Sequence, residues 1–277
     1  MSVRLIDSVD EFLATTEAYR SREPYLTNVI GSVASSIASG ARHYERCWWW
    51  VAEHDGEVVG VMMRTEPFKL ILSPLSPSDA ADAAAAVARV DAGLDGVTGP
   101  EDVVAGFCAA LGRAATIERG TLAYAIDDLV EPPRVAGAPR PATLDDFDTL
   151  LSWRYAMVDE IALEAFDHEA ALRSAIDDGR TCLWEVEGRP VCMVGCALPV
   201  ATPAGRVSRV GPVYTPLAQR RRGFAASLTG EVTRRLLERG DRVMLYTDAA
   251  NATSNGVYTR LGYHLIARSV EVALDPA

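Results

Sequence analysis

The chain has 277 residues, about 1.8 domains of ordinary size, so two domains are the first expectation. Its 27 basic and 38 acidic side chains give a net charge of −11, and this acidity disfavours a general nucleic-acid binder. Hydrophobic residues make up 49% of the chain and charged residues 23%, a composition that excludes wholesale disorder, collagen and a coiled coil.

The cysteines and the N-terminus point to the compartment. Five cysteines without a tight spacing pattern are typical of reduced thiols rather than of a disulfide framework. The N-terminus lacks the apolar run of a signal peptide. The uncharged run 190–205 is interrupted by Pro199 and Pro203 and is too short to span a bilayer. We therefore expect a cytoplasmic protein.

The first half of the chain is predicted to contain a hairpin, a further strand and a helix. The hairpin strands are 48–53 and 58–63, joined by the turn at 54–57. A strand-like segment, 68–72, and an alanine-rich helix, 78–90, follow it.

A domain boundary is predicted in the segment 131–141, which holds four prolines and one glycine. Such a segment can continue neither a helix nor a central strand. We therefore expect two domains, 1–134 and 135–277.

The second half is predicted to be mixed α/β. Its predicted elements are a helical stretch 143–178, strands 181–187 and 190–198, a strand 206–215, a helix 223–239, a strand 242–247, a helix 253–261 and a last strand 264–273. The turn at Glu187-Gly188-Arg189 is similar to the turn around Gly56 in the first half. The similarity predicts two related folds in tandem.

The sequence lacks the motifs of several common enzyme chemistries and binding sites. The sequence has no G-x-G-x-x-G loop, and Lys69, its single lysine, is not part of a P-loop. It also has no G-x-S-x-G nucleophile motif. The four histidines are far apart and no Cys-x-x-Cys pair occurs, so we expect no metal site.

One segment carries the pattern of an anion site. The strand 206–215 leads into Arg220, Arg221, Arg222 and Gly223, where an amphipathic helix begins. Free N–H groups and the helix dipole attract an anion there, and arginines add charge-assisted hydrogen bonds. The alternative is a basic first turn on a solvated helix, which is unfavourable unless an anion offsets its charge. The pattern therefore favours a bound phosphate.

Two segments resemble the GNAT acetyltransferase superfamily. Arg220-x-x-Gly223-x-Ala225 is similar to the loop that holds the pyrophosphate of acyl-CoA. The segment 251–263 is similar to the family's next segment, with an asparagine, a tyrosine seven residues later and a Gly-aromatic pair before the last strand. The resemblance covers about residues 140–277. It implies an α/β fold with an open, V-splayed mixed sheet flanked by helices, and the tandem pattern implies two such folds.

The resemblance also implies a binding site for acetyl-CoA between the fourth and fifth strands. It implies backbone pairing with the pantetheine at Val213 and Tyr214. The positions implied to contact the cofactor are Val213, Tyr214, Thr215, Arg220, Arg221, Arg222, Gly223, Phe224, Ala225, Asn251 and Ser254. Tyr258 falls at the family's general-acid position; the alternative is a packing tyrosine on an amphipathic helix.

The first half departs from the family pattern. No arginine or glycine lies between Leu70 and Ala88, and 73–77 reads Ser-Pro-Leu-Ser-Pro where the pyrophosphate loop falls. We expect this half to be a degenerate GNAT-like domain with a structural or acceptor-shaping role. The three tryptophans at 48–50 are interpreted as core and interface residues, with an acceptor pocket as the alternative.

A general base is expected from the helices after residue 141, because the strand 206–215 contains no carboxylate. The candidates are Asp159, Glu160, Glu164 and Asp167. We select Glu160 as the base; a solvated acidic face is the alternative. Cys192 and Cys196 are interpreted as core residues rather than nucleophiles.

The resemblance implies an acetyl-CoA-dependent N-acetyltransferase that acts on a primary amine of a small molecule or peptide by direct attack in a ternary complex. Two alternatives stay open: a mycothiol-synthase-like acetyltransferase, and a CoA-binding regulatory module without turnover. The expected partners are acetyl-CoA as co-substrate and the amine acceptor, without metal, nucleic acid or membrane, in a monomer or homodimer. The motifs carry no code for the acceptor.

Overall fold

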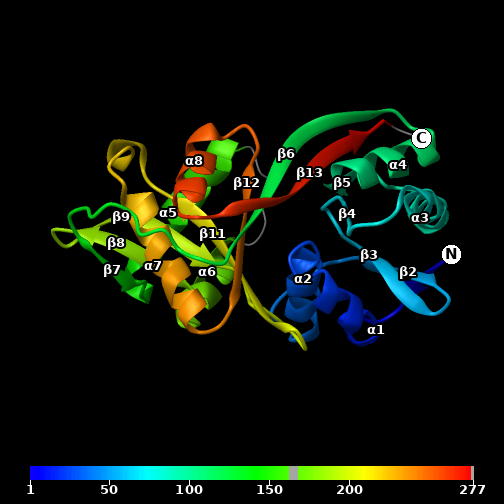
Figure 1. Cartoon of the computed structure of the whole chain (residues 1–277), viewed down its shortest axis with the longest axis horizontal. Coiled ribbons are helices and arrows are strands. Elements are labelled where there is room, and N and C mark those ends of the chain that lie inside the picture. The colour runs from blue at the N-terminus through cyan, green and yellow to red at the C-terminus, as the bar shows by residue number, and fades with distance from the viewer. Residues whose placement is uncertain (162–167, 276–277) are drawn as a thin grey trace.

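The strands form one continuous mixed sheet in the computed structural model, which describes residues 1–161 and 168–275 (Figure 1). The first half contributes β1 (Ser2–Ile6), α1 (Val9–Arg22), α2 (Asn28–Ala38), β2 (Cys47–His54), β3 (Glu57–Thr65), β4 (Leu70–Leu72), α3 (Pro77–Val90), β5 (Gly96–Pro100), α4 (Glu101–Leu111) and β6 (Ala115–Ile126). The predicted hairpin, strand and helix are confirmed as β2, β3, β4 and α3.

The second half follows the predicted order closely. It contributes β7 (Ala138–Pro141), the 3-10 turn η1 (Leu144–Asp146), α5 (Phe147–Ile161), α6 (His168–Asp177), β8 (Thr181–Val186), β9 (Arg189–Cys196), β10 (Val200–Thr202), β11 (Gly205–Tyr214), the 3-10 turn η2 (Leu217–Gln219), α7 (Phe224–Glu238), β12 (Arg242–Asp248), α8 (Ala252–Arg260) and β13 (His264–Leu274). Within the described residues, η1, α5 and α6 occupy the helical stretch predicted over 143–178. No helix in the described ranges is both long and apolar enough to cross a membrane.

The same succession of elements occurs twice. In each half a strand and two helices precede a β-hairpin, and then strand, helix, strand, helix and strand follow; the second half adds the short strand β10 and the two 3-10 turns. Both hairpins turn through two residues with positive φ: Asp55 and Gly56 at 50° and 81°, and Glu187 and Gly188 at 49° and 73°. Two such residues form a type I′ turn, whose twist matches that of the flanking strands. The predicted tandem repeat therefore has a structural counterpart.

The two halves exchange their last strands. The sheet order is β1-β2-β3-β4-β5-β13-β6-β12-β11-β9-β8-β7, with β10 beside β11. Thus β6 of the first half pairs with β12, while β13 of the second half pairs with β5. Figure 1 shows β6 and β13 side by side in a long antiparallel ribbon that joins the halves. The boundary at residue 135 stays a prediction; that residue lies in the connection between β6 and β7.

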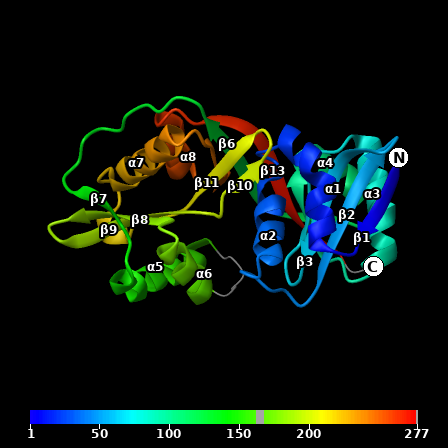
Figure 2. The same ribbon diagram turned by 90° about the horizontal axis from the view of Figure 1, so that it is seen from below.

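Helices cover both faces of the sheet (Figure 2). In the first half, Trp49 packs with α1 and α2, and Trp50 packs on the opposite face with α3 and α4. Trp48 packs against the same cluster as Trp50 and lies under the Arg64 guanidinium. The core interpretation is confirmed for Trp49 and Trp50, which are buried, whereas Trp48 is half-buried. In the second half, α7 and α8 cover one face of the sheet, and α5 and α6 cover the other.

Candidate functional site

The candidate site begins where two parallel strands separate. β11 and β12 pair in parallel from Val207–Arg242 to Val210–Leu245 and no further in the described sheet. On its other edge, β11 bulges after Val210 and resumes pairing with β9 at Val213. The backbone of Val213 and Tyr214 therefore has no strand partner on the β12 side. Backbone polar groups need partners, so this edge can bind an extended ligand with amide groups.

The loop after β11 leaves the start of α7 open. Arg221 and Gly223 have left-handed φ values of 62° and 84°, and α7 begins at Phe224. Gly223, the N-cap residue, has no side chain to cap the N-terminus of α7, and the first turn of this helix has no acidic residue. The first backbone bond of this turn runs from Ser227 N–H to the Gly223 carbonyl, so the N–H groups before Ser227 are available. This is the geometry of an anion site.

Arg220 connects this loop to the predicted base. Its Nε donates to the Thr215 carbonyl at 2.8 Å, and its Nη2 donates to both carboxylate oxygens of Glu160 at 2.8 and 2.7 Å. The Tyr214 hydroxyl donates to the same carboxylate at 3.4 Å. The Glu160 side chain is 37% exposed and remains reachable from solvent. Of the other base candidates, Asp159 lies on α5, whereas Glu164 and Asp167 lie outside the described residues.

The predicted general acid packs in the core of the second half. Tyr258, on α8, is 8% exposed, and burial, with a smaller effect of Cys192, raises the pKa of its phenol to about 12. Thr215 Oγ1 donates to the Cys192 Sγ at 3.2 Å. Burial also raises the pKa values of Cys192 and Cys196 to about 12, so both thiols stay protonated near neutral pH. This agrees with their interpretation as core residues.

Asn251 and Ser254 contact each other. The Asn251 side-chain oxygen accepts the Ser254 N–H at 3.0 Å and caps α8. Asn251 therefore has a structural role besides its expected contact with the cofactor. Phe224 is buried beneath the Arg222 guanidinium, and Ala225 packs against the same core cluster as Phe224.

The equivalent turn of the first half is closed. The Ser76 side chain accepts the Asp79 N–H at 3.2 Å at the start of α3, and Pro77 occupies the first turn. Asp79 pairs with His54 at 2.9 Å and adds a negative charge at this end. A Cβ added at Gly60 would lie 2.1 Å from Leu75, so the loop before α3 packs tightly on β3. This helix start disfavours a phosphate.

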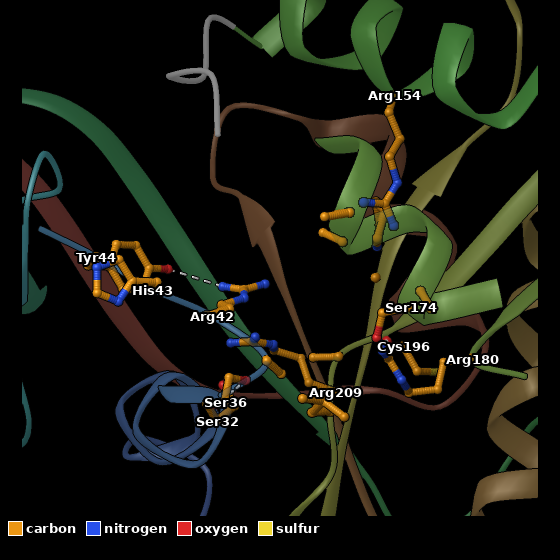
Figure 3. A pocket seen from close by; sticks show the side chains of 18 residues that line it. Ser32, Ser36, Arg42, His43, Tyr44, Arg154, Ser174, Arg180, Cys196 and Arg209 are labelled. Atoms are coloured by element: carbon orange, nitrogen blue, oxygen red, sulfur yellow. Dashed lines mark hydrogen bonds between the residues drawn. The ribbon is translucent and has the colours of Figure 1, made fainter. Parts of the chain in front are cut away.

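A second feature was not foreseen from the sequence. A cavity of about 440 Å³ lies between α2 of the first half and α5, α6 and β11 of the second (Figure 3). Arg42, Arg154, Arg180 and Arg209 line it. These residues come from four separate segments, so no local motif reveals them. One local signal is Arg209, a charged residue within an otherwise uncharged stretch of strand from Val207 to Tyr214.

Comparisons with known proteins agree with this architecture. Residues 202–272 match the model of a family described as FR47-like protein. A GNAT-family acetyltransferase structure from Colwellia psychrerythraea has a TM-score of 0.65 at 12% identity, over 99% of this chain and 100% of that one. A tandem GNAT protein from the clavulanic acid biosynthesis pathway has a TM-score of 0.58 at 11% identity, over 100% and 99% of the two chains.

A GCN5-related N-acetyltransferase from Sphaerobacter thermophilus has a TM-score of 0.58 at 17% identity, over 98% of this chain and 95% of that one. No curated protein sequence matches the chain. The GNAT resemblance is thereby confirmed for the fold: the chain has the mixed, open-sheet architecture of these acetyltransferases, including a tandem one.

Proposed function

We propose that this chain is an acetyl-CoA-dependent N-acetyltransferase whose second half binds the cofactor. The open N-terminus of α7 carries the proposal, because it follows a left-handed Gly223 in the loop after β11, the strand that has separated from β12. Phosphates bind such helix starts, and the separated strand edge supplies amide partners. The fold neighbours support the proposal, since they are described as acetyltransferases.

The proposed cofactor positions follow the chain. The backbone of Val213 and Tyr214 binds the pantetheine amides, and Thr215 follows them at the end of the strand. The amides of 221–225 bind the pyrophosphate, with Arg220 and Arg222 as charged donors beside them. Asn251 and Ser254 approach from the start of α8. A bound acyl-CoA supplies the activated thioester; the chain supplies its orientation and two proton transfers.

The proposed reaction is a direct attack. The neutral acceptor nitrogen forms a bond to the thioester carbonyl carbon, and the carbon–sulfur bond breaks. Tyr258 gives its proton to the departing thiolate, and Glu160 receives the proton that the amine loses, directly or through one water. The protein needs no covalent intermediate in this scheme.

Glu160 and Arg220 couple cofactor binding to the base in this proposal. Both Glu160 oxygens are bonded to Arg220 Nη2. A phosphate at the start of α7 attracts the same guanidinium and competes for it. We expect cofactor binding to draw Arg220 toward the phosphates and to release the Glu160 carboxylate for its proton.

Glu160→Gln should lower kcat about tenfold or more, because the amide cannot accept the amine proton. Acetyl-CoA affinity should stay within a few fold of wild type, measured by calorimetry. Asp159→Asn is the matched control, since Asp159 is the neighbouring carboxylate on the same helix. An equal kcat in the Glu160→Gln variant and the wild type would remove the base assignment.

The function itself is tested by thiol release. Purified protein is mixed with acetyl-CoA and panels of polyamines, amino acids, aminoglycosides and peptides, and free CoA is measured. Acetylation of a cysteinyl amine in preference to the others identifies a mycothiol-synthase-like enzyme. Acetyl-CoA binding without release in the presence of any amine identifies a regulatory module and contradicts the proposed activity.

One acetyl-CoA should bind each chain. The start of α7 is open, whereas the start of α3 is capped by Ser76 and carries Asp79. Isothermal calorimetry should therefore give a stoichiometry of one. Two equivalent sites would show that the first half also binds the cofactor.

A further inference from the structure

The arginine-lined cavity is built for a negatively charged ligand. Its 440 Å³ falls within the range of small-ligand pockets, about 300–1,000 Å³. Its described lining residues include no aspartate or glutamate, although the whole chain has a net charge of −11. The described side chains around this cavity therefore carry a local positive charge, opposite in sign to the net charge of the chain.

Arg154 is the strongest single indication that the cavity binds an anion. It is 8% exposed, and its Nε is buried with no hydrogen-bond partner among the described residues. In Figure 3 its side chain points from α5 into the cavity. A buried guanidinium N–H without a hydrogen-bond partner is unfavourable, and burial also disfavours the charge that it carries. Burial, with the neighbouring Arg180 and Arg42, lowers the pKa of Arg154 to about 10, because the site disfavours a further positive charge.

The other arginines of the cavity repel one another electrostatically in the same way. Figure 3 shows the guanidinium groups of Arg42 and Arg209 beside each other, and Arg42 contributes to lowering the pKa of Arg209, for which burial is the larger cause. Arg180 lies at the opposite wall, where it donates to the Cys196 carbonyl at 3.0 Å and pairs with Asp178. An anion placed among these groups would offset their mutual repulsion.

The position of the cavity connects it to the proposed reaction. Gly211 and Pro212 of β11 form part of its wall, directly before the Val213–Tyr214 edge proposed for the pantetheine. Ser32 and Ser36 of α2, in the first half, also line the cavity. The first half therefore contributes to a space that opens beside the proposed thioester path.

We propose that this cavity binds a carboxylate or phosphate group of the acceptor, so that the acetylated substrate is an amine that also carries an anionic group. The inference rests on the proposed function, because it assigns the acceptor of that reaction. Arginines supply forked donors that match the paired oxygens of either anion. A neutral or purely cationic amine leaves Arg154 Nε without a partner among the described residues.

Matched amine pairs test the inference. β-Alanine is compared with β-alanine amide, and O-phosphoethanolamine with ethanolamine. The wild type should prefer the anionic member of at least one pair by about tenfold or more in kcat/KM. The pair that shows the preference distinguishes a carboxylate from a phosphate ligand.

Arg154→Gln should reduce that preference by about tenfold, mainly through KM. Arg173→Gln, an exposed arginine of α6 stacked on Phe147, is the control and should leave it unchanged.

Stability without acetyl-CoA provides an independent readout. Arg154→Gln should raise the melting temperature of the unliganded protein, because an uncompensated buried charge is removed. Inorganic phosphate and acetate should stabilise the wild type more than this variant. Arg209→Gln serves as the second variant if Arg154→Gln does not fold, with the same loss of preference expected.

The outcomes separate the two proposals. Anion stabilisation that depends on Arg154, without acetylation of any amine, supports the cavity and contradicts the enzyme activity. Acetylation of amines without preference for an anionic group, and without anion stabilisation, supports the activity and overturns the cavity assignment. A preference that survives both substitutions also overturns it.

Discussion

Gly223→Glu should weaken acetyl-CoA binding by more than about 100-fold while the protein stays folded. Gly223 ends the loop with φ of 84°, and a Cβ there would lie 2.9 Å from Val135 Cγ1. The carboxylate would stand at the start of α7, where the proposed site holds phosphate oxygens. Each charge-assisted hydrogen bond contributes about 1.5–3 kcal/mol, so losing two of them accounts for the expected effect. Calorimetric titration measures the affinity, and thermal unfolding checks the fold.

Gly240→Glu is the matched control for this substitution. Gly240 follows the other end of α7, has a similar φ of 77°, and has nothing within 4 Å of an added Cβ. Both variants therefore place the same side chain at a left-handed position and carry similar backbone strain. Gly240→Glu should keep wild-type affinity for acetyl-CoA. Equal affinities in the two glutamate variants would contradict the phosphate assignment.

Tyr258→Phe should lower kcat by about 100-fold and leave acetyl-CoA affinity within a few fold. The substitution keeps the ring and removes the hydroxyl proposed to protonate the thiolate. General acids contribute about 10²–10⁴-fold, and a thiolate is a moderately good leaving group, so the low end is expected. Single-turnover kinetics measures the chemical step. A rate equal to wild type would mean that Tyr258 is a packing residue and that water protonates the thiolate.

Tyr263→Phe separates this effect from general loosening of the core. Tyr263 packs edge-to-face on Tyr258 at 6.1 Å, and its hydroxyl lies 2.6 Å from the Thr233 hydroxyl. Removing this hydroxyl should lower the stability by about 1 kcal/mol, since Thr233 loses its partner, with little change in kcat.

The pH profile gives a second check on Tyr258. An ordinary phenol ionises near pH 10, so the sequence alone predicts a falling rate there. Burial raises the pKa of Tyr258 to about 12, which keeps the phenol protonated at lower pH. The wild-type rate should therefore not fall between pH 8 and about 10.5 through this group. A fall centred near pH 10 that disappears in Tyr258→Phe would contradict the buried position.

The elements of the fold that could be predicted are specified by residues close together in the sequence. The turn pair Glu187-Gly188 specifies its hairpin because both residues adopt positive φ. α1 was missed although its boundaries carry ordinary signals: a Ser8 N-cap, acidic residues in the first turn, and Arg20 and Arg22 in the last. The pairing of β6 with β12 and of β13 with β5 could not be predicted, because these strands are far apart in sequence. No local sequence pattern specifies which distant strand lies beside which.

The candidate site likewise has one part that could be predicted from the sequence and one that could not. The loop 220–225 is contiguous, so its arginines, glycine and helix start can be recognised together in the sequence. The cavity requires Arg42 and Arg154 to meet across the two halves, and no spacing encodes that meeting. Arg154 stands in α5 beside Leu150 and Trp153, so its helical spacing places it near the apolar face. A charged residue there is the signal that could have indicated a binding role.

The exchanged strands also bear on how the protein is made. The ribosome releases β5 and β6 well before β13, yet β13 is the partner of both in the finished sheet. The first half therefore cannot complete its sheet while the rest of the chain is being synthesised. Until β13 emerges, both strands expose unpaired edges of the kind that recruit other chains. A strand translated after all the others of the sheet therefore closes the structure of the first half as well as the second.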